Sequence, residues 1–112
     1  MVHSQMLTET LTTNTTASVT IPLTVCASTA DTQTVTLADG TTVGQVKIFQ
    51  ATNANATDIT PDTTAGAYTK FTLTNIGDTV VCIWTGVGWA IISRASGSAA
   101  GNNAVVDMPI IS

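Results

Sequence analysis

A period-two alternation of apolar and polar residues is the feature that most restricts how this chain can fold. Residues 17–25 alternate in this way, which is the pattern of a β-strand with one buried face. Threonine is the commonest residue type and Glu9 is the only glutamate. Such a composition disfavours helices and favours strands. The sequence therefore predicts an all-β fold.

Turn residues divide the chain into short strands. Asp39-Gly40 lies between strand-like runs at 35–37 and 43–50, which predicts a hairpin because both residue types tolerate positive φ. Residues 79–93 predict a second hairpin, and a short strand is expected around Ile59. Seven or eight strands at this close spacing favour a small antiparallel β-sandwich or barrel, jelly-roll-like in form.

Some of these strands carry apolar residues on both faces. Residues 43–50 and 79–85 show this pattern, which suggests strands covered on two sides. Pro22 lacks an N–H group, so the strand over 17–25 is expected at a sheet edge or with its free side turned outward. Four residues of the second hairpin are assigned to the core: Val80, Cys82, Trp84 and Trp89.

The two ends of the chain differ from its middle. Residues 1–16 are mostly polar and predict an extended N-terminal arm that needs a partner surface to become ordered. Residues 17–112 predict a single β domain that ends in an apolar strand, docked on this or a neighbouring subunit. The apolar residues of both ends are the candidate partner-binding residues: Met6, Leu7, Leu11, Met108, Ile110 and Ile111.

The charge balance restricts the partners. The net charge is −4, and Lys47, Lys70 and Arg94 are the only permanent cations. Three scattered cations cannot form the basic patch that nucleic acid or an anionic membrane requires. No apolar run approaches the length of a membrane span, and the N-terminus lacks the pattern of a signal peptide. We therefore expect neither nucleic-acid nor membrane binding, and synthesis in the cytoplasm.

Catalytic and metal-binding constellations are not evident, so no enzyme activity and no cofactor are expected. The only histidine lies at position 3, within the predicted arm, and the aspartates sit mainly beside turn residues. Cys26 and Cys82 are expected to be buried free thiols, although a disulfide stays possible. Asp58 and Asp62 share one loop that could bind Ca²⁺. A structural zinc site lacks its ligands.

Two stretches carry a resemblance to a known class of protein. The first is Leu37-Ala-Asp-Gly-Thr-Thr-Val-Gly-Gln-Val-Lys-Ile-Phe49. The second is Phe71-Thr-Leu-Thr-Asn-Ile-Gly-Asp-Thr-Val-Val-Cys-Ile-Trp-Thr-Gly-Val-Gly-Trp-Ala-Ile-Ile92. Together they resemble a β-module of tailed-bacteriophage virion proteins, over about half of the chain. Thr85-Gly86 stands where that module usually has Asp-Gly.

This resemblance implies a non-enzymatic structural virion protein. Its most similar form is a capsid decoration (cement) protein, a homotrimer on the capsid exterior that clamps neighbouring major capsid protein subunits. The low charge agrees with an oligomer that buries surface between subunits. The alternative is a head- or tail-fibre module that binds a host glycan or receptor. In that alternative Trp89 and the loop at 53–66 form the binding rim.

Overall fold

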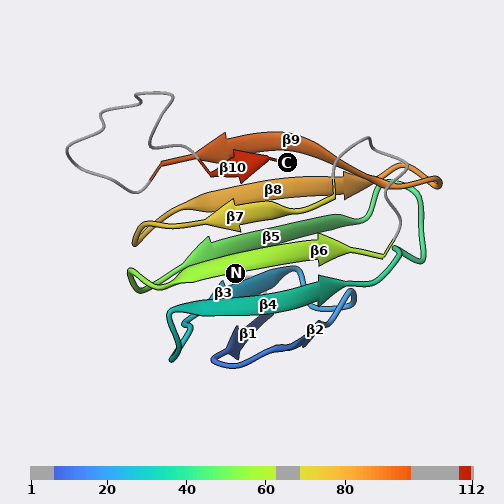
Figure 1. The fold of residues 1–112 in the computed structure, drawn as a ribbon. Coiled ribbons are helices and arrows are strands. Elements are labelled where there is room, and N and C mark those ends of the chain that lie inside the picture. Colours follow the sequence, from blue (N-terminus) through green and yellow to red (C-terminus); the bar gives the residue numbers. More distant parts are fainter. Residues whose placement is uncertain (1–6, 63–68, 97–108, 112) are drawn as a thin grey trace, which may run out of the picture.

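The computed structural model describes residues 7–62, 69–96 and 109–111. In these residues the fold is all-β and sandwich-like, with two packed five-stranded sheets and no helix (Figure 1). Sheet A has the order β1-β3-β5-β8-β9 and sheet B the order β10-β7-β6-β4-β2. The strands are β1 (Thr8–Leu11), β2 (Thr15–Ala17), β3 (Leu23–Cys26), β4 (Thr32–Leu37), β5 (Val46–Ala51), β6 (Ala56–Pro61), β7 (Phe71–Leu73), β8 (Thr79–Trp84), β9 (Trp89–Ala95) and β10 (Ile110–Ile111).

The first six strands wind back and forth between the two sheets. Each odd strand lies in sheet A and the following even strand lies in sheet B, so three successive coils stack on one another. Strands of the same sheet in neighbouring coils are therefore parallel. From β7 onward the pairing is antiparallel. In Figure 1 the three coils build upward from the blue strands β1 and β2 to the green strands β5 and β6, and the orange and red strands β9 and β10 lie above them.

The antiparallel sandwich or barrel predicted from the sequence is wrong in its finer detail. Half of the eight strand pairings among the described residues are parallel, and the sheets do not close into a barrel. Asp39-Gly40 does not connect a hairpin, because β4 belongs to sheet B and β5 to sheet A. Turn chemistry at these two residues allows a chain reversal but does not determine which strands pair.

Backbone and side-chain hydrogen bonds join the turns at one end of the coils. Ala27 N donates to Leu11 O at 2.9 Å, and Thr52 N donates to Cys26 O at 3.1 Å. The side-chain amides of Asn53 and Asn55 both donate to Ser28 O, at 2.8 and 2.9 Å. The parallel coils are thus connected at their turns as well as along their strands.

The described part of the predicted arm belongs to the β domain. Residues 8–17 contribute β1 and β2, which pair with β3 and β4. The single strand predicted over residues 17–25 is wrong, because Ala17 ends β2 in sheet B and β3 begins at Leu23 in sheet A. Pro22 directly precedes β3, which lies between β1 and β5, so the predicted edge position is wrong as well. Residues 1–6 lie outside the described residues. The N-terminal segment is ordered against the chain's own strands, because these bury part of its apolar surface.

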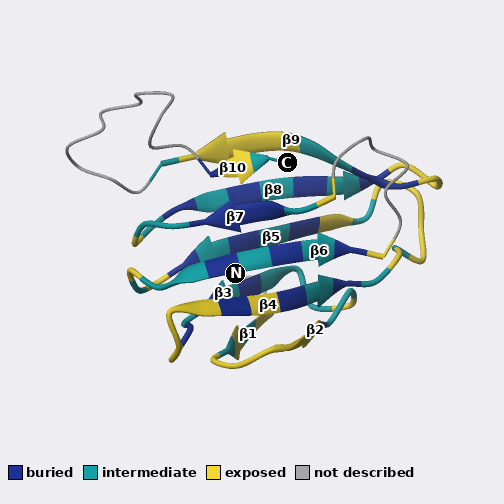
Figure 2. Ribbon diagram, viewed as in Figure 1, coloured by how far each residue is buried: buried dark blue, intermediate teal, exposed yellow. Residues whose placement is uncertain are grey.

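The hairpin predicted at 79–93 is present as β8 and β9. Its four predicted core residues, Val80, Cys82, Trp84 and Trp89, are all buried. The two indole rings pack edge to face with centroids 5.4 Å apart. Along β5, β6 and β8 buried residues alternate with partly exposed ones (Figure 2), so each strand turns one row of side chains to the core.

Candidate functional site

The two stretches that resemble the virion module pack against each other. Gly40 lies directly against the Trp84 ring, where a Cβ atom would come within 2.3 Å of its Cγ. Gly44, at φ 91°, donates its N–H to Trp84 O at 2.8 Å. The Trp89 indole N–H donates to Ala38 O at 2.8 Å. These motif residues hold the fold together, so the resemblance they carry concerns the fold and does not outline a reaction site.

A buried ion pair lies beneath β1. The Lys47 side chain is fully buried, and its Nζ lies 3.3 Å from Glu9 Oε2. Nζ also donates to the carbonyl oxygens of Ser18 and Ile21, at 2.5 and 2.6 Å. Glu9 Oε2 in turn accepts from Ser18 N at 2.8 Å and from the Thr24 hydroxyl at 2.7 Å. The network connects β1, β3, β5 and the segment between β2 and β3.

The electrostatics of this pair are unequal. Burial lowers the pKa of Lys47 more than the nearby Glu9 carboxylate raises it. Burial alone would raise the pKa of Glu9, but hydrogen bonds from Thr24 and Ser18 and the charge of Lys47 lower it overall. The carboxylate therefore gains from the arrangement while the ammonium is buried at a cost. No substrate can reach Lys47 in this position, so we assign the pair a structural role.

The outer face of sheet A is aliphatic. Its side chains point away from the buried rows because neighbouring residues on a strand alternate between faces. Along β3, β5 and β8 this face consists of Leu23, Val25, Val46, Ile48, Val81 and Ile83, with threonine and glutamine beside them. Val46 is 39% exposed. We call these six residues the aliphatic face.

Two further exposed valines stand at the end of this face. Val43 and Val87 are 70% and 69% exposed. Val43 reaches the β8–β9 turn, since its Cγ2 lies 3.1 Å from where a Cβ of Gly86 would be. Next to them Val46 pairs with Ile83 at the ends of β5 and β8. The apolar surface thus extends beyond the sheet onto the adjoining loops.

The outer face of sheet B has a different character. Its outward residues on β2, β4, β6 and β7 are mainly threonines, namely Thr16, Thr32, Thr34, Thr36, Thr60 and Thr72. Asp58 lies among them, accepts from the Thr72 hydroxyl at 2.7 Å and pairs with Lys70 at 3.5 Å. Hydroxyl groups and an ion pair suit a solvated surface. The two outer faces of the sandwich therefore differ in polarity.

The predicted partner-binding residues fall into three groups. Leu11 and Ile111 are partly buried and pack against the chain's own core. Leu7 is 66% exposed beside β1 and Ile110 is 52% exposed on β10. Met6 and Met108 lie outside the described residues. Leu7 and Ile110 lie at opposite edges of the sandwich, because β1 ends sheet A on one side and β10 ends sheet B on the other (Figure 1).

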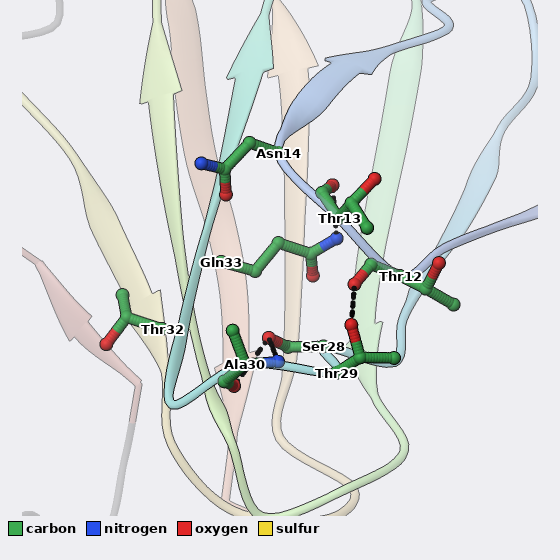
Figure 3. Close-up of a pocket in the computed structure, with 8 residues that line it drawn as sticks. All are labelled: Thr12, Thr13, Asn14, Ser28, Thr29, Ala30, Thr32 and Gln33. Carbon is green, nitrogen blue, oxygen red and sulfur yellow. Dashed lines mark hydrogen bonds between the residues drawn. The ribbon is translucent and has the colours of Figure 1, made fainter.

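A polar hollow of about 330 Å³ lies at the turns of the first two coils. Figure 3 shows its hydroxyl and amide lining, with Gln33 donating to Thr13 O at 2.7 Å and Thr29 to Thr12 O at 3.0 Å. The hollow is lined by Thr12, Thr13, Asn14, Ser28, Thr29, Ala30, Thr32 and Gln33. It contains no aromatic ring and no charged group. The sequence did not indicate it, because it forms between turns of different coils.

The thiols of Cys26 and Cys82 belong to the core. Cys26 and Cys82 are free and buried, and burial raises the pKa of each thiol to about 12. Within residues 7–62, 69–96 and 109–111 no cluster of three or more His, Cys, Asp or Glu side chains is placed to hold a metal ion. The same residues include no helix long and apolar enough to cross a membrane.

No protein-family model matches this sequence, and no curated protein is significantly similar to it. Its function must therefore be inferred from its residues and its fold.

Proposed function

We propose that this chain is a non-enzymatic structural virion protein that decorates the exterior of a tailed-phage capsid. In this role it binds neighbouring major capsid protein subunits and acts as a homo-oligomer, a trimer in the proteins that it resembles. The main supporting observation is the aliphatic face, in a chain of which only 9% of the residues are charged. Exposed apolar sheet surface of this kind is typical of proteins that bury it against partners.

The positions of the exposed apolar residues support a clamping role. Leu7 at one edge and Ile110 at the other can each contact a different neighbour. A decoration protein of this type stabilises a capsid through modest contacts repeated over many copies, which together resist the pressure of the packaged DNA. Leu7, which directly precedes β1, would form one end of the clamp.

The copy number of the chain in purified source particles tests this proposal. Quantitative mass spectrometry against the major capsid protein should give a ratio near one to one for a capsid decoration protein. A ratio of a few per hundred would point to a fibre, neck or tail component instead. Absence from the particles would refute a virion role.

Deleting the predicted arm would disrupt the fold as well as the proposed capsid contact. Deletion of residues 1–16 would remove β1 together with Glu9 and most of β2. Such a variant would lose stability as well as any capsid contact, so its failure to bind would be uninformative. Leu7→Ser at the exposed position tests the same contact without removing a strand, and its capsid occupancy should fall while its urea midpoint stays unchanged.

The glycan-binding alternative would rely on the polar hollow. Trp89 is 1% exposed and cannot offer its ring to a sugar, so the expected aromatic rim is wrong. The hydroxyl and amide groups of the hollow could instead bind a polyhydroxylated ligand. Thr29 is exposed, and its hydroxyl reaches Thr12 O across the hollow, so Thr29→Trp would place an indole ring there. Binding to host polysaccharide that Thr29→Trp abolishes would favour this alternative, and binding that it leaves intact would exclude the hollow.

A further inference from the structure

We propose that the aliphatic face of sheet A is the surface through which copies of this chain associate with one another. The inference assigns the oligomer contact to one of the two sheets, and it does not depend on the chain being a virion protein. It rests on the charge distribution, on the shape of the face and on its area.

Charge favours contact between copies at this face over other parts of the described surface. The chain has a net charge of −4, so two copies repel each other where their acidic residues meet. The outward positions of β1, β3, β5 and β8 carry no charged side chain. The exposed Arg94 of the edge strand β9 is in register with the buried Val80 and donates to Pro109 O, so it belongs to the other row of its strand. The outer face of sheet B, by contrast, carries Asp58 and Lys70. Two like-charged copies can therefore approach through sheet A without burying an unpaired charge.

The shape and side chains of the face suit packing onto another sheet. Four of its six residues are β-branched valine or isoleucine on the central strands β5 and β8. Within the molecule, sheets A and B pack through buried apolar residues of both sheets, among them Val35, Ile59 and Val80, as sheets about 10 Å apart do in general. A copy presenting the same face could repeat that packing on the outside of sheet A.

The available area sets the expected strength. The five strands of sheet A are four to seven residues long and lie about 4.8 Å apart, so the outer face of the sheet covers roughly 430 Å². Two copies would therefore bury about 850 Å² in total, which is the size of a weak, transient interface. The exposed valines Val43 and Val87 at the end of the face add to this area. We expect association that depends on concentration in the micromolar range and above.

Native mass spectrometry and light scattering of the purified full chain test the inference. Wild type should shift from single copies to a dimer, because the same face on both copies makes a twofold contact, as its concentration rises to about 1 mM, the range of weak specific association. Ile48→Glu places a carboxylate at the centre of the aliphatic face and should weaken association at least tenfold. Thr34→Glu places the same charge on the outer face of sheet B and should associate like wild type.

A second variant distinguishes a lost contact from a lost fold. Replacing Val25, Val46 and Val81 by threonine keeps the β-branched shape and makes sheet A resemble the outer face of sheet B. This variant should stay folded, with buried-tryptophan fluorescence like that of wild type, and remain a single copy. A wild type that stays a single copy at about 1 mM, or a folded threonine variant that still associates, would overturn the inference. Both readouts use the isolated chain, so they are independent of the copy number in particles.

Discussion

Removing the carboxylate of Glu9 tests whether the ion pair between Glu9 and Lys47 stabilises the packing of β1 on the rest of the fold. In Glu9→Ala the Lys47 ammonium keeps the carbonyl oxygens of Ser18 and Ile21 but loses its counter-charge, 3.3 Å away. The Thr24 hydroxyl and the Ser18 amide lose their acceptor as well. Breaking one side of a buried pair costs about 3–5 kcal/mol. We expect about 3 kcal/mol, at the lower end of that range, because the Glu9 side chain is 17% exposed and water can reach its place.

Replacing Lys47, alone and together with Glu9→Ala, completes a double-mutant cycle for the ion pair. Lys47→Met should cost less, about 2 kcal/mol, because Glu9 keeps two hydrogen-bond donors and some contact with water. Methionine can also pack against Phe49 in place of the lysine. The double variant should be more stable than the sum of the two single effects implies, by about 2 kcal/mol, because neither charge is left alone.

Urea unfolding followed by tryptophan fluorescence measures these free energies, since Trp84 and Trp89 are both buried. Thr10→Ala on the exposed side of β1 is the control and should stay within about 0.5 kcal/mol of wild type. A loss below about 1 kcal/mol in Glu9→Ala would contradict a dry, paired ammonium. Strict additivity of the Glu9 and Lys47 effects would refute their coupling.

Three further expectations concern pH, thiol reactivity and packing. Because the folded protein lowers the pKa of Glu9, that group's contribution to stability is complete above its ordinary value of 4.5 and is lost as the pH falls through the folded pKa. The urea midpoint should therefore drop more steeply below pH 4.5 in wild type than in Glu9→Gln, and parallel curves would exclude this contribution. Cys26 and Cys82, with pKa values of about 12, should resist a thiol reagent at pH 8 until urea unfolds the chain, whereupon both react; rapid labelling of native protein would contradict their burial. Gly40→Ala should lower stability by about 3 kcal/mol, because the new Cβ would lie 2.3 Å from the Trp84 ring. An unchanged urea midpoint in that variant would show that the ring can move aside.

The aliphatic face shows how a sequence signal can be interpreted in two ways. Apolar residues on both faces of 43–50 and 79–85 predicted strands covered on two sides. In the structure β5 and β8 are interior strands of sheet A, but their outer rows stay partly exposed in the described part of the chain. Under the proposal that copies associate through this face, the pattern is the signal of an interaction surface. Sequence alone could not distinguish a strand covered by its own chain from a strand covered by a partner, because both need the same side chains.

The ion pair between Glu9 and Lys47 could not be predicted from the sequence, for another reason. Glu9 and Lys47 are 38 residues apart, and neither position carries a local signature of burial. They meet because the chain returns to sheet A at β5, two strands away from β1. Coulombic pairing depends on distance in space, which only the stacking of the coils determines.

The amino-acid sequence by itself determined the features that depend on neighbouring residues. Period-two alternation set the buried rows of β5, β6 and β8, and local turn chemistry set the hairpin at 79–93. The same alternation over residues 17–25 did not make one strand, because the chain passes there from β2 in sheet B to β3 in sheet A. Only the tertiary structure decided that the first six strands wind between two sheets and pair in parallel. The physical reason is that alternation and turn preferences act over a few residues, whereas the choice of strand partner depends on which apolar faces meet across long stretches of chain. That choice also placed β1 over Lys47 and left one sheet with an aliphatic outer surface.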